Sequence, residues 1–168
     1  MINWKNDIIN NDLDSFEIGN IWSYADNLSE IINDMIYMTA NLKYDCIAGI
    51  ETKGLIFASG LSAKTGIPLI VFRKKDKIAY TEKKISDDFI NWKGQKDGIE
   101  IELDLLFRYQ NILIVDDLSY SLATFKSVSK IINQKEKIVS FLCVANLSAE
   151  DEIDGKPILS IFKKKAKN

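Results

Sequence analysis

The sequence predicts an α/β fold in which a mostly parallel central sheet carries helices on its faces. Three observations lead to this prediction. Short, continuous apolar runs, typical of buried strands, alternate with stretches of helical period. Their order is strand, helix, strand, polar excursion, strand, helix and strand, as expected for a parallel sheet. The length of 168 residues fits one domain with a single core.

The first half of the chain contains two predicted helices and two predicted strands. The first helix has a broad apolar stripe, and Asp26 has a suitable side chain for its N-cap. The second helix ends where Gly66 and Pro68 break the pattern. In chain order, the predicted elements are a helix over residues 26–42, a strand over 44–50, a helix over 54–64 and a strand over 68–72.

Residues 73–98 differ in character from the elements around them. They are polar and charged, contain Gly94 and Gly98, and show no sustained period. Long loops in a compact domain are usually functional lids or disordered segments, so we expect a mobile loop over about residues 77–98. The elements predicted after it are a half-exposed strand over 99–103, a buried strand over 111–115, a helix over 122–133 and a strand over 137–145.

The two ends of the chain flank the predicted sheet. We expect residues 1–168 to form a single domain, with a small hood from about residues 1–24 and 147–168 over one end of the sheet. Ligands of parallel α/β sheets bind beyond the carboxyl ends of the strands. The loops that matter most are therefore residues 51–54, the segment from Arg73 onward, and residues 116–124.

The composition excludes several classes of function. The chain has no histidine, which rules out Ser-His-Asp and Cys-His relays and histidine-ligated metal sites within it. A formal net charge of −2 gives no reason to expect a nucleic-acid partner. No apolar run has the length of a membrane span and no signal peptide is recognisable, so we expect a cytoplasmic protein with no membrane partner. Cys46 and Cys143 lie in apolar runs and are expected to act as small hydrophobes.

Asp116 and Asp117 follow a buried-type strand directly. Adjacent residues on a strand point to opposite sides, so one carboxylate is expected to face a ligand. Carboxylates there accept hydrogen bonds from sugar hydroxyls or hold hydrated Mg²⁺. A Walker B acid is a rival interpretation, but the chain has no G-x-x-x-x-G-K loop to accompany it. A helix N-cap is the structural alternative, and the motif alone leaves it open.

The residues after the two aspartates lead into the next predicted helix. Free N–H groups at a helix N-terminus form an anion site, and Ser121 and Thr124 add hydroxyls. The alternative is a capping arrangement that binds nothing.

At these residues the sequence resembles a known family. Ile114-Val115-Asp116-Asp117-Leu118, followed by Ser121-Leu122-Ala123-Thr124, is similar to the 5-phosphoribosyl-1-pyrophosphate (PRPP) signature of the type I phosphoribosyltransferases. The likeness is closest to the adenine and xanthine phosphoribosyltransferase branch and runs from about Phe16 to Phe162. Three further matches stand in the expected order, over residues 16–21, over residues 49–57, which resemble the pyrophosphate loop G-x-E-[SA]-R-G-F-x-F, and over residues 72–75.

The resemblance implies a type I phosphoribosyltransferase fold and an enzyme that moves phosphoribose from PRPP to a nucleobase, a purine in this branch, releasing pyrophosphate. It further implies nucleotide salvage, Mg²⁺ as cofactor, a homodimer, and a mobile loop that closes over the reacting centre. Asp116 and Asp117 would be the catalytic residues, contacting the ribose hydroxyls directly or through Mg²⁺. The implied ligands of the 5′-phosphate are Ser119, Tyr120, Ser121, Leu122, Ala123 and Thr124. Those of pyrophosphate are Thr52, Lys53, Gly54, Arg73, Lys75 and Lys77.

Several positions depart from the family pattern. The family has T-G-G-T where this chain has Ser121-Leu122-Ala123-Thr124, and leucine resists the positive φ that glycine allows. Leu122 also extends the apolar face of the predicted helix. Tyr120 replaces an alanine, and Lys53 replaces an arginine and loses its bidentate geometry. These departures favour an alternative function, a catalytically impaired relative that binds a nucleotide or PRPP as a regulator or interaction module.

Two further questions stay open. An unrelated α/β protein with an accidental Val-Asp-Asp is a third interpretation, which four ordered matches disfavour. The sequence also does not identify the base. The aromatic candidates for stacking on it are Trp22, Tyr24, Phe57 and Trp92, although aromatic residues are more often part of a core.

Overall fold

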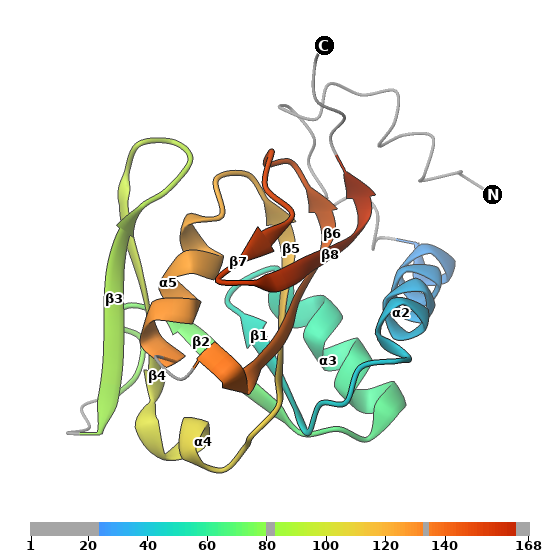
Figure 1. The fold of residues 1–168 in the computed structure, drawn as a ribbon, viewed down its shortest axis with the longest axis horizontal. Helices are drawn as coiled ribbons and strands as arrows, with labels where there is room; N and C mark the ends of the chain where they lie inside the picture. Colours follow the sequence, from blue (N-terminus) through green and yellow to red (C-terminus); the bar gives the residue numbers. More distant parts are fainter. Residues whose placement is uncertain (1–23, 80–82, 133–134, 164–168) are drawn as a thin grey trace.

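The computed structural model describes residues 24–79, 83–132 and 135–163 (Figure 1). Its elements are α2 (Ala25–Thr39), β1 (Cys46–Ile50), α3 (Gly54–Thr65), β2 (Leu69–Lys74), β3 (Lys84–Ile90), β4 (Lys96–Glu102), α4 (Leu103–Phe107), β5 (Ile112–Ser119), α5 (Ala123–Ile132), the 3₁₀ turn η2 (Lys135–Lys137), β6 (Ile138–Asn146), β7 (Glu152–Ile153) and β8 (Lys156–Lys163). No helix among these residues is both long enough and apolar enough to cross a membrane.

The strands form one eight-stranded sheet in the order β3-β4-β2-β1-β5-β6-β8-β7. Its centre is parallel, because β1 pairs with β2 and β5, and β6 pairs with β5 and β8. The antiparallel pairs lie toward the two edges, where β4 joins β2 to β3 and β7 closes on β8. The predicted α/β class, with a mostly parallel sheet flanked by helices, is confirmed.

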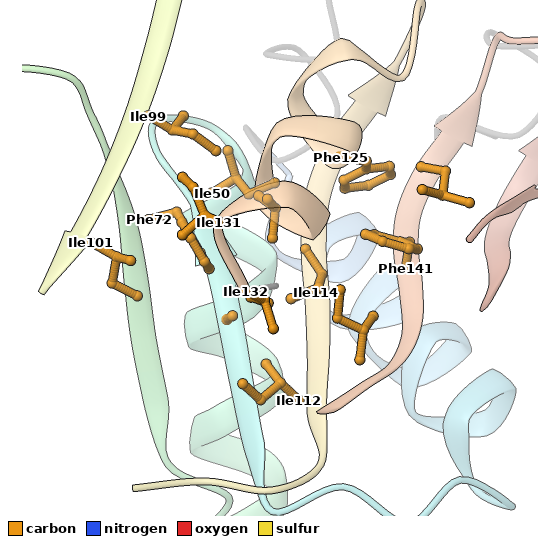
Figure 2. Close-up of a cluster of buried hydrophobic side chains, with 14 of the residues drawn as sticks. Ile50, Phe72, Ile99, Ile101, Ile112, Ile114, Phe125, Ile131, Ile132 and Phe141 are labelled. Carbon is orange, nitrogen blue, oxygen red and sulfur yellow. The ribbon is translucent and has the colours of Figure 1, made fainter. Parts of the chain in front are cut away.

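Two apolar clusters cover the two faces of the sheet. Along β5, Ile112 and Ile114 point into one cluster, whereas Leu113 and Val115 point into the other, as the period of two in a strand requires. The first cluster packs under α5, and Figure 2 shows Phe125, Ile131 and Ile132 of α5 facing the sheet. The second is covered by α2 and α3, which lie on the other side of the sheet in Figure 1. The carboxyl ends of the central strands are thereby held between two helical layers.

The helix ends agree only in part with the sequence prediction. Gly66 caps α3 in the left-handed conformation with φ of 73°, as predicted. The prediction that Asp26 caps the first helix is wrong, because Tyr24 occupies the N-cap and Asp26 lies within the first turn. Cys46 and Cys143 are buried free thiols, in agreement with their apolar surroundings.

The polar segment over residues 73–98 contains a strand that the sequence did not predict. β3 lies inside it and pairs along its whole length with β4. The strand predicted over residues 99–103 is longer and begins at Lys96, and the prediction that it is half exposed is wrong. Glu100 is fully buried, and the cost of burying its carboxylate is offset by hydrogen bonds from the Lys77 and Ile78 amides and from Lys84.

The C-terminal segment also differs from the expected hood. β8 joins the main sheet in parallel beside β6, so much of residues 147–163 extends the sheet. The N-terminal part of the hood, the matched residues 16–21 and Trp22 lie outside the described residues.

Candidate active site

A cavity of about 780 Å³ opens at the carboxyl ends of β1, β2 and β5. Its walls come from four parts of the chain that are distant in sequence. They are residues 50–53 at the end of β1, Lys74 at the end of β2, residues 116–125 at the end of β5 and the start of α5, and the inner side of the β3–β4 hairpin. This is the edge at which a parallel sheet is expected to bind its ligand.

Asp116 and Asp117 line this cavity from within β5. The strand continues to Ser119 and α5 begins at Ala123, so neither aspartate is a helix N-cap and that alternative is excluded. The Asp117 amide donates to Asp116 Oδ1 over 2.8 Å. This hydrogen bond fixes the Asp116 carboxylate against the backbone of its neighbour.

The aspartate pair has an unbalanced electrostatic environment. Burial, and then the charge of Asp117, raise the pKa of the Asp116 carboxyl well above its ordinary value of 3.8. Burial, and then the charges of both aspartates, raise the pKa of the Cys143 thiol behind them. A site with two adjacent carboxylates and a raised pKa gains stability from a proton, a cation or hydroxyl donors.

Gly54 lets the start of α3 approach the aspartates closely. A Cβ on Gly54 would stand 2.7 Å from Asp116 Oδ1 and 2.8 Å from Asp116 Cα, which is closer than real Cβ atoms come to their neighbours. The N-terminal end of α3, which carries partial positive charge, is thus set against Asp116. This close approach explains why the pyrophosphate-loop pattern over residues 49–57 has glycine at position 54.

Leu122 occupies the loop between β5 and α5 in a left-handed conformation. Its φ is 56°, and its carbonyl accepts the amide of Lys126 over 2.8 Å to start the helix. Its side chain is only 2% exposed and packs in the cluster under α5. The predicted extension of the apolar face is confirmed, although α5 itself begins one residue later. The leucine keeps a backbone shape usually given to glycine and turns its side chain away into the core.

The remaining loop residues present polar groups to the cavity. Ser119, Tyr120, Ser121, Ala123 and Thr124 all line it together with Leu122. The Ser119 carbonyl accepts the Leu147 amide over 2.7 Å, which ties the start of the loop to the end of β6. The predicted phosphate-binding residues are therefore brought together by the fold.

The basic residues predicted for pyrophosphate are only partly brought together. Thr52 and Lys53 line the cavity, and the Glu51–Thr52 peptide before them is cis. Arg73 lies beside this loop, since its Nε donates to Glu51 Oε2 over 2.9 Å. That hydrogen bond lowers the pKa of Glu51 below its ordinary value of 4.5.

Lys75 and Lys77 do not line the cavity. Lys75 Nζ lies 2.6 Å from Asp88 Oδ1 on β3, and the backbone amide of Lys77 donates to Glu100. Lys74, which the family resemblance does not implicate, lines the cavity instead. β2 ends at Lys74, and neighbouring residues at a strand end point in different directions, so the sequence alone does not tell which of the two lysines faces the ligand.

The aromatic residues considered for stacking on the base lie in different parts of the structure. Phe57 is fully buried in the core under α2 and α3, so the prediction that it stacks on a base is wrong. Tyr24 lies at the start of α2 and does not line the cavity. Trp92, at the tip of the β3–β4 hairpin, lines it and stacks on Tyr120. The hairpin also contributes Asn91, Lys93 and Lys96, which the sequence did not single out.

The chain is similar to known proteins along most of its length. Residues 20–165 match the family described as the phosphoribosyl transferase domain. The adenine phosphoribosyltransferase of Pelagibacter ubique is 35% identical over 124 residues, which cover 73% of this chain and 69% of the relative. That of Prochlorococcus marinus is 31% identical over 130 residues, covering 77% and 75%.

Solved structures show the same fold. The adenine phosphoribosyltransferase of Thermoanaerobacter pseudethanolicus superposes with a TM-score of 0.78 at 24% identity, covering 88% of this chain and 87% of that one. The enzyme from Giardia lamblia, complexed with 9-deazaadenine, gives a TM-score of 0.75 at 15% identity, covering 89% and 86%. With the family match and the Pelagibacter relative, these findings show that the chain belongs to the type I phosphoribosyltransferases, in the adenine phosphoribosyltransferase branch.

Proposed function

We propose that the protein transfers the phosphoribosyl group of PRPP to a ring nitrogen of adenine, releasing pyrophosphate and forming AMP for nucleotide salvage. The observation that carries this proposal is the joint placement of Asp116-Asp117 and the left-handed loop at Leu122 around one cavity. The choice of adenine rests on the relatives, which are named adenine phosphoribosyltransferases.

The loop between β5 and α5 holds the 5′-phosphate. The amides at the start of α5 are not used inside the helix, and an anion there gains from both their hydrogen bonds and the helix dipole. Ser121 and Thr124 add hydroxyl donors from the same cavity wall. The leucine side chain does not stand in the way of this role, because it lies in the core.

Asp116 and Asp117 hold the ribose. Ionised carboxylates accept hydrogen bonds from the two ring hydroxyls and favour the positive charge that develops on the ribosyl carbon as its bond to pyrophosphate breaks. Burial, and then the charge of Asp117, raise the pKa of Asp116, and hydroxyl donors offset both by hydrogen bonding to the ionised carboxylate. The pair therefore binds the sugar and stabilises the transition state with the same oxygens.

Mg²⁺ fits this arrangement as a partner of the substrate. The described part of the chain has no cluster of three or more side chains of the kinds that ligate metals. Mg²⁺ is usually bound through one or two carboxylates together with substrate phosphates, and Asp116 and Asp117 supply that number. When bound, it would neutralise charge on pyrophosphate and on the aspartates.

The segment after β1 receives pyrophosphate. Thr52 and Lys53 present backbone amides and an ammonium group, and Lys74 faces the same cavity. Glu51 fixes Arg73 and the Lys74 amide through one carboxylate oxygen, Oε2, at 2.9 Å from each donor. Positive charge is thus placed where negative charge develops on the leaving group. The hairpin residues above the cavity shield the reacting carbon from water.

A calorimetric titration of the full chain with PRPP and MgCl₂ tests the binding step, with Asp117→Asn as the matched variant. We expect binding by the wild type and greatly weakened binding by the variant. A product assay with adenine, guanine, hypoxanthine, xanthine and orotate then tests catalysis and base choice. Absence of heat at millimolar PRPP, or binding without turnover of any base, would overturn the proposal. We also propose a cytoplasmic homodimer, which light scattering of the purified chain tests for its oligomeric part.

A further inference from the structure

The tip of the β3–β4 hairpin touches the phosphate loop, the connection between β5 and α5 over residues 120–122, through two aromatic rings. Trp92 lies in the turn between β3 and β4, and Tyr120 lies between β5 and α5. Their ring centroids are 4.6 Å apart and the ring planes differ by 18°, which is a stacked pair. The ammonium group of Lys93 lies 5.0 Å from the centroid of the same Trp92 ring. Trp92 is nevertheless 52% exposed, so the core does not determine its position.

The strands of the hairpin pack against α5, and Trp92 lies in the turn beyond these contacts. Ile85 and Phe89 pack against the cluster under α5. On the same face of β3, the Asp87 carboxylate accepts a hydrogen bond from Ser127 Oγ over 2.9 Å and pairs with Lys130. The turn itself is closed by Asn91, whose side-chain oxygen accepts the amides of Lys93 and Gln95. The contacts of β3 with α5 and the hydrogen bonds within the turn therefore carry Trp92 to the loop between β5 and α5.

The phosphate loop is held from two sides. Leu122 fixes it from the core, where its side chain is buried. Tyr120 fixes it from the hairpin through the stack on Trp92. A leucine with φ of 56° is in an unfavourable conformation that persists only when its surroundings enforce it. A loop with that residue needs more support than one built from glycines.

We propose that Trp92 and Tyr120 are a positioning pair whose stacking holds the loop between β5 and α5 in the shape that binds the 5′-phosphate of PRPP. The pair makes PRPP affinity depend on the hairpin tip, although Trp92 belongs to a segment distant in sequence from the loop. This inference rests on the proposed function, since it concerns the affinity for that substrate.

Steady-state kinetics of five variants and one control test the pair. The variants are Trp92→Ala, Tyr120→Ala, the double alanine exchange, Trp92→Phe and Tyr120→Phe. Ile90→Ala is the control, because Ile90 is also exposed on the hairpin but lies outside the cavity wall. We expect each alanine exchange to raise the KM for PRPP about fivefold, as the loss of one aromatic pair predicts. The KM for adenine and kcat should stay unchanged.

The double exchange and the phenylalanine exchanges separate stacking from other roles. If the two rings act only on each other, the double exchange raises the KM for PRPP no further than a single one. Each phenylalanine exchange keeps a ring in place and should recover most of the affinity. Additive losses, or a Tyr120→Phe variant as weak as Tyr120→Ala, would overturn the pair. An unchanged KM for PRPP in both alanine variants would overturn it while leaving the proposed function intact. A wild type that binds no PRPP would instead remove the proposed function and this inference with it.

Discussion

Asp116 is the residue at which function and stability oppose each other. Burial and the neighbouring Asp117 raise the pKa of its carboxyl, so the folded state binds a proton more tightly there than the unfolded chain does. The ionised group therefore destabilises the fold increasingly as pH rises above its ordinary value of 3.8. An uncharged isostere removes this effect and still accepts the Asp117 amide.

We predict that Asp116→Asn raises the melting temperature near neutral pH by about 2–4 °C, while it weakens PRPP binding. The gain should shrink as pH falls toward 3.8 and vanish well below it, where the wild-type carboxyl is protonated in both the folded and the unfolded state. Thermal unfolding of the wild type and the variant between pH 4 and pH 8 checks both statements. A variant less stable than the wild type at pH 8 would show that the carboxylate is compensated by groups already present in the protein.

Leu122 gives a second prediction at the residue scale. The family pattern has glycine at this position, and leucine resists the positive φ that glycine allows. The backbone of Leu122 is already left-handed, so Leu122→Gly opens no new conformation, and it empties a buried site. Removing a buried leucine costs about 2–5 kcal/mol, and relief of the left-handed strain returns about 1 kcal/mol.

We therefore predict that Leu122→Gly lowers the free energy of unfolding by about 2–3 kcal/mol and leaves PRPP affinity no better than in the wild type. Urea unfolding and calorimetry measure the two quantities. Ala123→Gly is the matched exchange, because Ala123 fills the other glycine position of the motif and buries far less apolar surface. PRPP affinity that rises in Leu122→Gly alone would restore leucine as the obstacle.

At this scale the sequence predicted the chemistry of the site better than its geometry. The Asp116-Asp117 pair and the loop that follows were found because the residue types and their order carry the signal. Lys75 was assigned in place of Lys74, because only the strand register decides which of the two faces the cavity. Glu51 matches the pyrophosphate-loop pattern in the sequence. Its contact with Arg73 joins residues 22 positions apart and is visible only in the fold.

Among the elements, β3 was missed because of one inward-facing polar residue. Ile85 and Phe89 lie on the side of the strand that packs against the core, and Asp87 lies between them on the same side. Its carboxylate is satisfied there by Ser127 and Lys130 of α5, two partners that no local pattern reveals. The apolar alternation that predicts a strand is therefore interrupted in the sequence, although it is structurally continuous.

Glu100 supports the connection between β2 and β3, and we predict that Glu100→Gln loosens it. The carboxylate accepts the Ile78 amide over 2.6 Å, the Lys77 amide over 2.9 Å and Lys84 Nζ over 3.0 Å. An amide side chain keeps at most part of this set and leaves Lys84 without its charge partner. We expect the free energy of unfolding to fall by about 1–3 kcal/mol near pH 7, measured by urea denaturation.

The pH dependence of this variant provides its control. Burial alone would raise the pKa of Glu100, but the hydrogen bonds from Ile78 and Lys84 outweigh it and lower the pKa below 4.5. The stability from this carboxylate is thus present above pH 4.5 and is lost as pH falls below it. The difference in the free energy of unfolding between wild type and Glu100→Gln should therefore narrow as the pH falls below 4.5. Equal stability near pH 7 would show that the buried contacts contribute nothing.

For the whole molecule, the sheet separates two cores and places the hairpin on one of them. The hairpin is continuous with the sheet through β4 and is docked on α5 through Ile85, Phe89 and Asp87. A lid over all of residues 77–98, as the sequence predicts, would have to give up those contacts on opening. The turn over residues 91–95 can move without losing the contacts with α5, although its motion would separate Trp92 from Tyr120. Closure over the substrate is therefore expected to be a motion of the tip.

Hydrogen exchange followed by mass spectrometry decides whether the tip alone or the whole hairpin moves as the lid. We predict that, without ligand, amides of β4 facing β3 exchange at least about tenfold more slowly than those of residues 91–95, because paired and packed backbone opens less often. Adding PRPP with Mg²⁺ should slow exchange in the tip and leave the rest of the hairpin unchanged. Ser127→Ala is a suitable control, since it removes a support of Asp87 from outside the cavity wall and should speed exchange in β3 without ligand. Fast exchange throughout residues 84–102 of the free wild type, slowed as one unit by PRPP, would show that the whole hairpin detaches from α5 and closes as a single lid.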